Sequence, residues 1–264
     1  MQSLNVLLVG QGKSVEHIKK SKFLNKLYTV SNKEIDGTIN IKFNTFKELA
    51  YKCRTLQIDI VLVEEEKWIL EGITDVMKQN YINCFGVNMS WTDLRLSHDF
   101  TRKMLNKYDI NVPPLINLPF DYPVVVKGDG ILKIANSMQE IISIKEEAYK
   151  KSLEVAKNIF LEKFLNGAKY KVTSLFDGKH LITFPIENIE RDLLNDYSSK
   201  LENMFVCEKA NFVGFFNSYV IFEDNKLYNT GFSLGFEYPN LNPTNDFLYI
   251  CLSAIYQKLN EIEL

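Results

Sequence analysis

The chain has 264 residues, of which 46% are hydrophobic and 24% are charged, and its formal net charge at pH 7 is −2. This composition excludes a disordered chain, and the charge excludes the strongly basic character of proteins that bind nucleic acid through its phosphates. No apolar run approaches the ~20 residues of a membrane-spanning helix, so we expect no membrane association.

The amino-terminal residues and the cysteines predict a cytoplasmic protein. Residues 1–5 (M-Q-S-L-N) have neither the basic start nor the small-residue cleavage site of a secretory signal. The four cysteines, Cys53, Cys84, Cys207 and Cys251, are far apart and form no C-x-x-C pair. In a chain of this size we expect reduced thiols that lie mostly in the core.

The first 90 residues predict an open parallel sheet. Continuous apolar runs, typical of strands buried on both faces, occur at residues 6–9, 27–30, 58–63 and 82–85. Helices are expected from about Val15, after an N-cap at Asn44, and as one segment through residues 69–77. Strands and helices that alternate at this spacing favour right-handed crossovers. We therefore predict a Rossmann-like lobe over residues 1–90.

The remainder of the chain predicts an α+β region with antiparallel strands. A helix at 97–108 and the double proline Pro113-Pro114 form a connector over residues 91–120. Hairpins are expected around Asp177-Gly178 and around residues 223–225, because such turn residues accept positive φ. Further strands are expected at 122–127 and 159–164, and helices at 139–158 and 246–259. We divide this region into segments 121–185 and 186–264.

Six short motifs follow one another along the chain. They are Gly10-Gln11-Gly12-Lys13-Ser14-Val15-Glu16-His17, residues 58–63 with Glu66 and Ile69, Phe85-Gly86 with Leu94, Ser97 and Phe100, Tyr122 to Gly130, Glu162 to Gly167, and Phe176 to His180. Each motif is weak alone, but their order and spacing are much more specific. Together they resemble the glycinamide ribonucleotide synthetase (phosphoribosylamine–glycine ligase) family of the ATP-grasp superfamily. The chain is similar to a shortened, divergent member.

The resemblance implies an ATP-dependent carboxylate–amine ligase of purine biosynthesis, in which an acyl phosphate made from ATP is attacked by an amine. It implies a pre-ATP-grasp Rossmann-like lobe followed by an ATP-grasp-like region, and no counterpart in this chain of the family's C-terminal domain. ATP is the implied nucleotide, with contacts at Lys127, Glu162, Phe164 and Leu165. The implied substrate contacts are Gly10, Gly12, His17 and Glu66.

Two family features are replaced in this sequence. The glycine-rich loop K-A-D-G-L-A-A-G-K-G-V, which covers the phosphates in the family, is reduced to Lys127-Gly128-Asp129-Gly130 before an apolar stretch. The family's Mg²⁺-binding strand carries a glutamate, an asparagine and an arginine, at the positions of Asn229, Gly231 and Ser233. Because Mg²⁺ prefers carboxylate oxygens, we expect no metal ligands at these positions.

For each candidate residue a structural interpretation stays open beside the functional one. Lys127 can be a phosphate ligand or a solvated lysine at a strand end, and Gly10 and Gly12 can simply form a tight turn. His17 can be a surface residue of a helix. The run 64–66 (E-E-E) can be an acid/base or metal cluster or a solvated loop, in which only Glu66 matches the family. His98 and His180 lack a ligand array at metal spacing.

Three functions remain for the tertiary structure to separate. The first is a ligase relative with impaired or lost activity that still binds a nucleotide, a metabolite or a protein. The second is an active ATP-dependent ligase with relocated metal ligands, for which the candidate acids are Glu208, Glu223 and Glu237. The third is a non-catalytic interaction protein. The sequence names neither a substrate nor a protein partner.

Overall fold

A computed structural model of the chain describes residues 3–117, 120–153, 157–241 and 245–263. The chain forms two compact units. Unit 1 contains Met1–Thr92, Val172–Asn217 and Ser233–Leu264, and unit 2 contains Asp93–Lys171 and Ser218–Phe232. The division into segments 1–90, 91–120, 121–185 and 186–264 stays a prediction.

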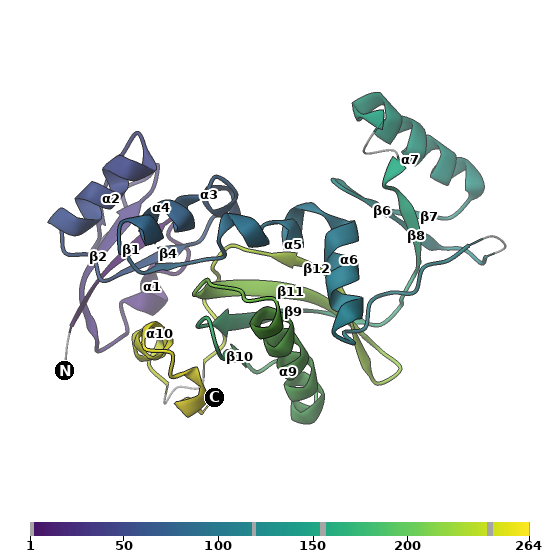
Figure 1. The fold of residues 1–264 in the computed structure, drawn as a ribbon. Coiled ribbons are helices and arrows are strands. Elements are labelled where there is room, and N and C mark those ends of the chain that lie inside the picture. Colours follow the sequence, from purple (N-terminus) through teal and green to yellow (C-terminus); the bar gives the residue numbers. More distant parts are fainter. Residues whose placement is uncertain (1–2, 118–119, 154–156, 242–244, 264) are drawn as a thin grey trace. The chain divides into compact units, whose positions relative to one another are not determined.

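Unit 1 is built on a parallel sheet with the strand order β3-β2-β1-β4-β5 (Figure 1). Its strands are β1 (Leu4–Val9), β2 (Leu24–Val30), β3 (Ile39–Asn40), β4 (Ile60–Val63) and β5 (Cys84–Phe85). All four residues of β4 are buried, which explains its uninterrupted apolar sequence. The predicted parallel sheet is confirmed, although its short edge strand β3 is not among the predicted strands.

Helices cover both faces of this sheet. The helices α1 (Val15–Ile18) and α10 (Phe247–Ile255) pack on one face in a core that includes Val6, Leu8 and Leu62. On the other side lie α2 (Phe46–Thr55), α3 (Glu66–Leu70) and α4 (Ile73–Gln79), as Figure 1 shows. The sheet is thus covered on both sides, as a parallel sheet requires.

Two helix boundaries differ from the predictions in this half. The N-cap of α2 is Thr45, not Asn44, because the Thr45 side chain accepts the Glu48 N–H at 3.2 Å. The segment through residues 69–77 is not one helix. Gly72 lies between α3 and α4 with φ of +87°, a left-handed conformation that interrupts the helical path.

A sheet with the order β10-β9-β11-β12 follows in the second half. Its strands are β9 (Ala168–Phe176), β10 (Leu181–Thr183), β11 (Gly214–Glu223) and β12 (Lys226–Ser233). Both predicted hairpins are confirmed, and positive φ at Gly178, Asp224 and Asn225 forms their turns. The 17-residue helix α9 (Arg191–Cys207) was not predicted.

The helix predicted at residues 246–259 is shorter and more buried than an amphipathic surface helix. It is α10, which ends at Ile255, and the short 3₁₀ turn η2 (Leu259–Glu261) follows. Gln257, with φ of +55°, separates the two. A similar 3₁₀ turn, η1 (Met89–Trp91), follows β5. Most residues of α10 are buried in the core, so the helix lacks the polar, solvent-exposed face of an amphipathic surface helix.

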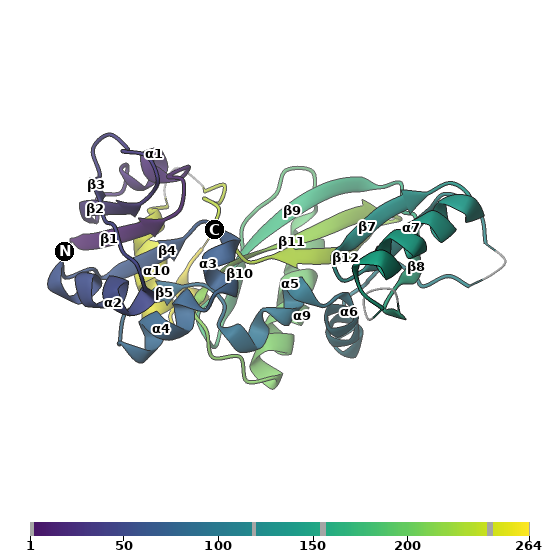
Figure 2. The same cartoon turned by 90° about the horizontal axis from the view of Figure 1, so that it is seen from above.

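Unit 2 contains an antiparallel sheet with the order β7-β6-β8. Its strands are β6 (Val124–Gly128), β7 (Ile131–Ala135) and β8 (Phe160–Lys163), and its helices are α5 (Asp93–Leu96), α6 (His98–Lys107) and α7 (Met138–Lys151). Figure 2 shows α7 lying across this sheet, where it packs on Val124 and Val126. Residues 154–156 of the predicted helix 139–158 lie outside the described residues.

The cysteine prediction is confirmed. All four cysteines are free, and Cys53, Cys84 and Cys251 are buried. Burial raises the pKa of the Cys53 and Cys84 thiols to about 12, so both stay protonated and unreactive at neutral pH. Among the described residues, no helix is both long enough and apolar enough to cross a membrane.

Candidate functional site

Unit 2 contains a cavity of about 620 Å³ that collects the four sequence-predicted nucleotide residues. We call it the Lys127 pocket; its lining is Pro113, Val125, Lys127, Leu132, Lys133, Ile134, Glu162, Lys163, Phe164, Leu165, Lys169, Tyr170, Tyr219, Val220, Ile221 and Thr230. Its volume lies within the range of ~300–1,000 Å³ typical of small-molecule sites.

The walls of the Lys127 pocket are apolar because of strand alternation. Val124 and Val126 face α7, so Val125 and Lys127 point to the other side of the sheet. Pairing across β6 and β7 places Ile134 beside Val125 and Leu132 beside Lys127. Both β7 residues are at least half exposed, as suits a wall that is open to a ligand. Tyrosines of β9 and β11 complete the lining.

Lys127 is the cation of this pocket, and it is 5% exposed. Its Nζ donates to the Thr230 carbonyl oxygen at 2.8 Å and approaches Glu162 Oε2 at 3.4 Å. The alternative of a solvated strand-end lysine is therefore wrong. Burial lowers the pKa of Lys127, while the neighbouring carboxylate opposes that shift. The ammonium carries three hydrogens, and these are the two acceptors that the described residues give it.

Glu162 lies between two cations. Arg102 of α6 donates from Nη1 to Glu162 Oε1 at 2.7 Å and from Nη2 to the Pro113 carbonyl oxygen at 2.7 Å. Burial raises the pKa of Glu162, and both cations oppose that shift. Together, Glu162, Arg102 and Lys127 carry one negative and two positive charges. Their net charge is therefore positive, which favours an anionic ligand. No sequence signal singled out Arg102, because only the fold brings α6 to β8.

The segment after β8 contributes the other two predicted nucleotide residues. Phe164 is partly exposed and Leu165 is buried, and both line the pocket. Their path is fixed by the next residues, since the Asn166 N–H donates to Glu223 Oε1 at 2.7 Å. At Gly167 a Cβ would lie 2.1 Å from the Phe222 carbonyl oxygen, so only glycine fits.

A tight turn joins β6 to β7 where the sequence showed the shortened glycine-rich loop. Gly128 pairs with Ile131 across this turn, and Gly130 has φ of +73°. Asp129 Oδ1 accepts the backbone N–H of His98 at 3.0 Å, which fixes the turn to the start of α6. The apolar residues that follow are strand β7. The described residues between β6 and β7 therefore form a short anchored turn and no extended loop.

At the β12 positions where the resemblance implies Mg²⁺ ligands, the chain carries no carboxylate. Asn229 is 1% exposed, and its Oδ1 accepts the Gly231 N–H at 2.8 Å. Gly231 offers no side-chain oxygen, and neither residue supplies a carboxylate. Within the described ranges, no three His, Cys, Asp or Glu side chains are arranged to hold a metal ion.

In unit 1, the Gly10–Ser14 turn that follows β1 is occupied by a side chain of the chain itself. Glu64 Oε2 accepts the N–H of Gly12 at 2.7 Å and of Lys13 at 3.3 Å, and Oε1 accepts that of Ser14 at 2.8 Å. Successive backbone N–H groups of this kind bind anions. The sequence left the run 64–66 open between an acid/base or metal cluster and a solvated loop, and neither interpretation gives Glu64 this role. The signal for the role is an acid directly after the strand that neighbours β1.

The other two predicted substrate residues also have partners within unit 1. His17 stacks on Tyr238, with 4.5 Å between ring centroids. Glu66 Oε1 accepts the Leu234 N–H at 2.7 Å. His17 lines a cavity of about 780 Å³, whereas Glu66 is not part of that lining. Gly10 and Gly12 are likewise not part of the lining of the cavity beside His17.

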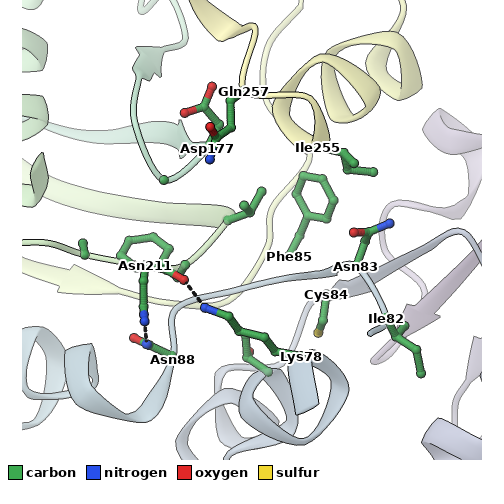
Figure 3. Close-up of a pocket in the computed structure, with 15 residues that line it drawn as sticks. Lys78, Ile82, Asn83, Cys84, Phe85, Asn88, Asp177, Asn211, Ile255 and Gln257 are labelled. Atoms are coloured by element: carbon green, nitrogen blue, oxygen red, sulfur yellow. Dashed lines mark hydrogen bonds between the residues drawn. The ribbon is translucent and has the colours of Figure 1, made fainter. Parts of the chain in front are cut away.

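A further cavity of about 430 Å³ lies beside β5 in unit 1 (Figure 3). Lys78 donates to the Asn211 carbonyl oxygen, and Asn88 donates to the Asn211 side chain. Asp177 accepts the backbone N–H groups of Lys179 and His180. Several polar groups of this cavity therefore already have partners, whereas the buried hydroxyl of Thr74 has none within the described residues. None of the eight sequence-predicted residues lines the cavity.

Comparison with solved structures gives the fold. The chain superimposes with a TM-score of 0.67 on phosphoribosylamine–glycine ligase from Thermotoga maritima, with 13% identity over 98% of this chain and 76% of that one. It matches D-alanine–D-alanine ligase from Bacillus anthracis, solved in complex with ATP, with a TM-score of 0.60, 18% identity and coverage of 99% and 95%. The chain has an ATP-grasp ligase fold.

By sequence, the chain is similar to phosphoribosylamine–glycine ligases. It is 22% identical over 322 aligned residues to phosphoribosylamine–glycine ligase from Fusobacterium nucleatum, covering 99% of this chain and 75% of that protein. It is 25% identical over 215 residues to the same enzyme from Methanosphaera stadtmanae, covering 69% of this chain and 48% of that protein. The chain thus spans about three quarters of the first relative and about half of the second. No family model matches it.

Proposed function

We propose that this ATP-grasp chain binds an adenine nucleotide in the Lys127 pocket and has impaired or lost ligase activity. The observation that supports binding is a buried ammonium group in a cavity of about 620 Å³ whose walls are mostly apolar. Apolar walls suit a purine ring, and a buried cation suits a phosphate, because charge-assisted hydrogen bonds are stronger in a poorly solvated site. Phe164 and Leu165 would contact the ring and Lys127 a phosphate.

Impaired chemistry is supported by three features. Asn229 and Gly231 offer no carboxylate for Mg²⁺. The turn at Asp129 is short and anchored to α6, so it leaves no extended loop to cover the phosphates of ATP. Glu64 already accepts the N–H groups of the Gly10–Ser14 turn, where the resemblance placed substrate contacts. These features affect catalysis and substrate binding but leave the Lys127 pocket open.

Thermal unfolding with ATP, ADP and AMP tests the binding. A ligand present at about 100 times its dissociation constant stabilises the folded state by about 2.7 kcal/mol. The Lys127→Met variant should lose most of the stabilisation by nucleotide, while Arg102 still pairs with Glu162 and maintains the fold. Lys145→Met, which changes an exposed lysine of α7, is the matched control. Absence of any stabilisation by all three nucleotides would contradict the proposal.

Ligase activity is tested separately. With ATP, Mg²⁺, glycine and phosphoribosylamine, we expect ADP release no faster than in a reaction without protein. Release that depends on both glycine and phosphoribosylamine would instead support an active ligase with relocated metal ligands. Glu223→Gln would then be examined first, because Glu223 contacts the segment that follows β8.

A further inference from the structure

The cavity of about 430 Å³ beside β5 is separate from the two regions discussed so far (Figure 3). All of its described lining residues belong to unit 1, and it shares none of them with the Lys127 pocket. The lining includes Ile82 and Asn83, which precede β5, so the cavity reaches the amino end of this edge strand. Ligands of parallel α/β sheets bind at the carboxyl ends of the strands, where the Gly10–Ser14 turn lies.

Lys78 is the cation of this cavity. It is an exposed residue of α4, and its Nζ donates to the Asn211 carbonyl oxygen, as Figure 3 shows. That is the one acceptor that the described residues give it, so two of the three ammonium hydrogens are available. The other charged residue of the described lining, Asp177, is 0% exposed and accepts three backbone N–H groups. The charge that a ligand meets is therefore that of Lys78.

Thr74 places a second donor on the same face of α4, because it lies one helical turn before Lys78. Thr74 is 3% exposed, and its hydroxyl has no hydrogen-bond partner within the described part of the chain. Burial raises the pKa of the neighbouring Cys84 thiol to about 12, although the Thr74 hydroxyl opposes that rise. The thiol is therefore neutral and only a weak acceptor. An acceptor that enters the cavity can give the Thr74 hydroxyl the hydrogen bond that burial makes valuable.

We propose that this cavity binds a small carboxylic acid with an apolar body, whose carboxylate accepts from Lys78 and from the Thr74 hydroxyl. The body packs on Val213 and Ile255, which are partly exposed apolar residues of the lining. One available cation matches the single charge of a carboxylate, and a few polar groups in a mostly apolar cavity are typical of small-molecule sites. The site is independent of the proposed nucleotide binding, so either can fail without the other.

Titration of the full chain with phenylacetate and with phenylacetamide, followed by NMR, tests the inference. The two probes share an aromatic body and a carbonyl acceptor and differ in charge. We expect saturable shifts of the backbone amide signals of Cys84, Val213 and Ile255 with both probes. Phenylacetate should bind about fivefold more tightly, as an ion pair with an exposed lysine gives. Absence of saturable shifts at these residues up to about 10 mM probe would overturn the inference. Equal affinities would overturn the role of the charge.

Two variants assign the binding to residues. Lys78→Met should remove the advantage of phenylacetate without weakening phenylacetamide. Lys47→Met, which changes an exposed lysine of α2, is the matched control and should keep that advantage. Loss of the advantage in both lysine variants would contradict the assignment to Lys78. Thr74→Val keeps the shape of the side chain but removes the hydroxyl, so both probes should bind about threefold more weakly. Unchanged affinities in this variant would overturn the role of Thr74.

Discussion

The two units differ in the groups that can bind negative charge. At the Gly10–Ser14 turn of unit 1, the donors are backbone N–H groups, and the chain supplies the anion itself through Glu64. In the Lys127 pocket of unit 2, the donor is an ammonium group that is partly neutralised by Glu162 and faces an apolar cavity. A site filled by an internal carboxylate is closed to ligands, whereas a cation with a spare hydrogen beside free space can accept one.

The largest expected effect is that of removing the charge of Glu162. Glu162→Gln would leave Arg102 and Lys127 buried without their counter-ion. Breaking a buried ion pair in this way costs about 3 kcal/mol or more, which urea unfolding would measure as a lower midpoint at an unchanged slope. A loss below about 1 kcal/mol would mean that water screens the cluster in spite of its burial.

Removing the Glu64 carboxylate of unit 1 should destabilise the fold less than Glu162→Gln does. Glu64→Ala leaves the N–H groups of Gly12 and Ser14 without their carboxylate. We expect the free energy of unfolding to fall by about 1–2 kcal/mol, because water can replace some of the lost hydrogen bonds. The same unfolding experiment measures this. In the wild-type protein, ribose 5-phosphate should give no stabilisation, and a clear stabilisation would show that Glu64 does not close the turn.

The hydrogen bond that anchors the β6–β7 turn of unit 2 should contribute about as much to stability as a helix cap does. Asp129→Ala removes the acceptor of the His98 N–H at the start of α6, and we expect a loss of about 1 kcal/mol. Hydrogen exchange of the first-turn amides of α6 should become faster in this variant. Unchanged exchange would indicate that the turn is held by its own hairpin and not by Asp129.

The last expected effect is a pH dependence of the stability that comes from His98. Because burial lowers the pKa of His98 in the folded chain to about 4, below its ordinary value of 6.5, the unfolded chain binds its proton first. The contribution to stability is therefore complete above about pH 6.5 and decreases as the pH falls toward 4. Unfolding measured at pH 7, 6 and 5 should show this decrease, and His98→Gln should reduce it. An NMR titration of His98 with a midpoint near 6.5 would contradict the burial argument.

Much of the fold followed from local patterns. The buried runs at residues 6–9 and 58–63 predicted the parallel sheet, because strands covered on both faces cannot alternate polar residues. The Asp177-Gly178 turn predicted a hairpin through its need for positive φ. The helix break at Gly72 was not predicted, since a glycine within a helical period fixes neither a left-handed conformation nor a boundary.

The candidate site was predictable only in part. The motif order located Lys127, Glu162, Phe164 and Leu165, and the fold gathers all four on one pocket. Arg102 and Glu64 were missed because their partners are distant in the sequence: Arg102 and Glu162 are 60 residues apart, and Glu64 and Gly12 are 52. Contacts of that range leave no periodic signal.

The sequence by itself determined most of the strands, the hairpin turns at 177–178 and 223–225, and the absence of carboxylates at Asn229, Gly231 and Ser233. These are properties of side chains and of local backbone preference, so they can be read without coordinates. The tertiary structure alone decided how charges are paired. Whether Lys127 is solvated or buried, and whether the Gly10–Ser14 turn is free or held by Glu64, depends on which distant groups the fold brings within hydrogen-bond distance.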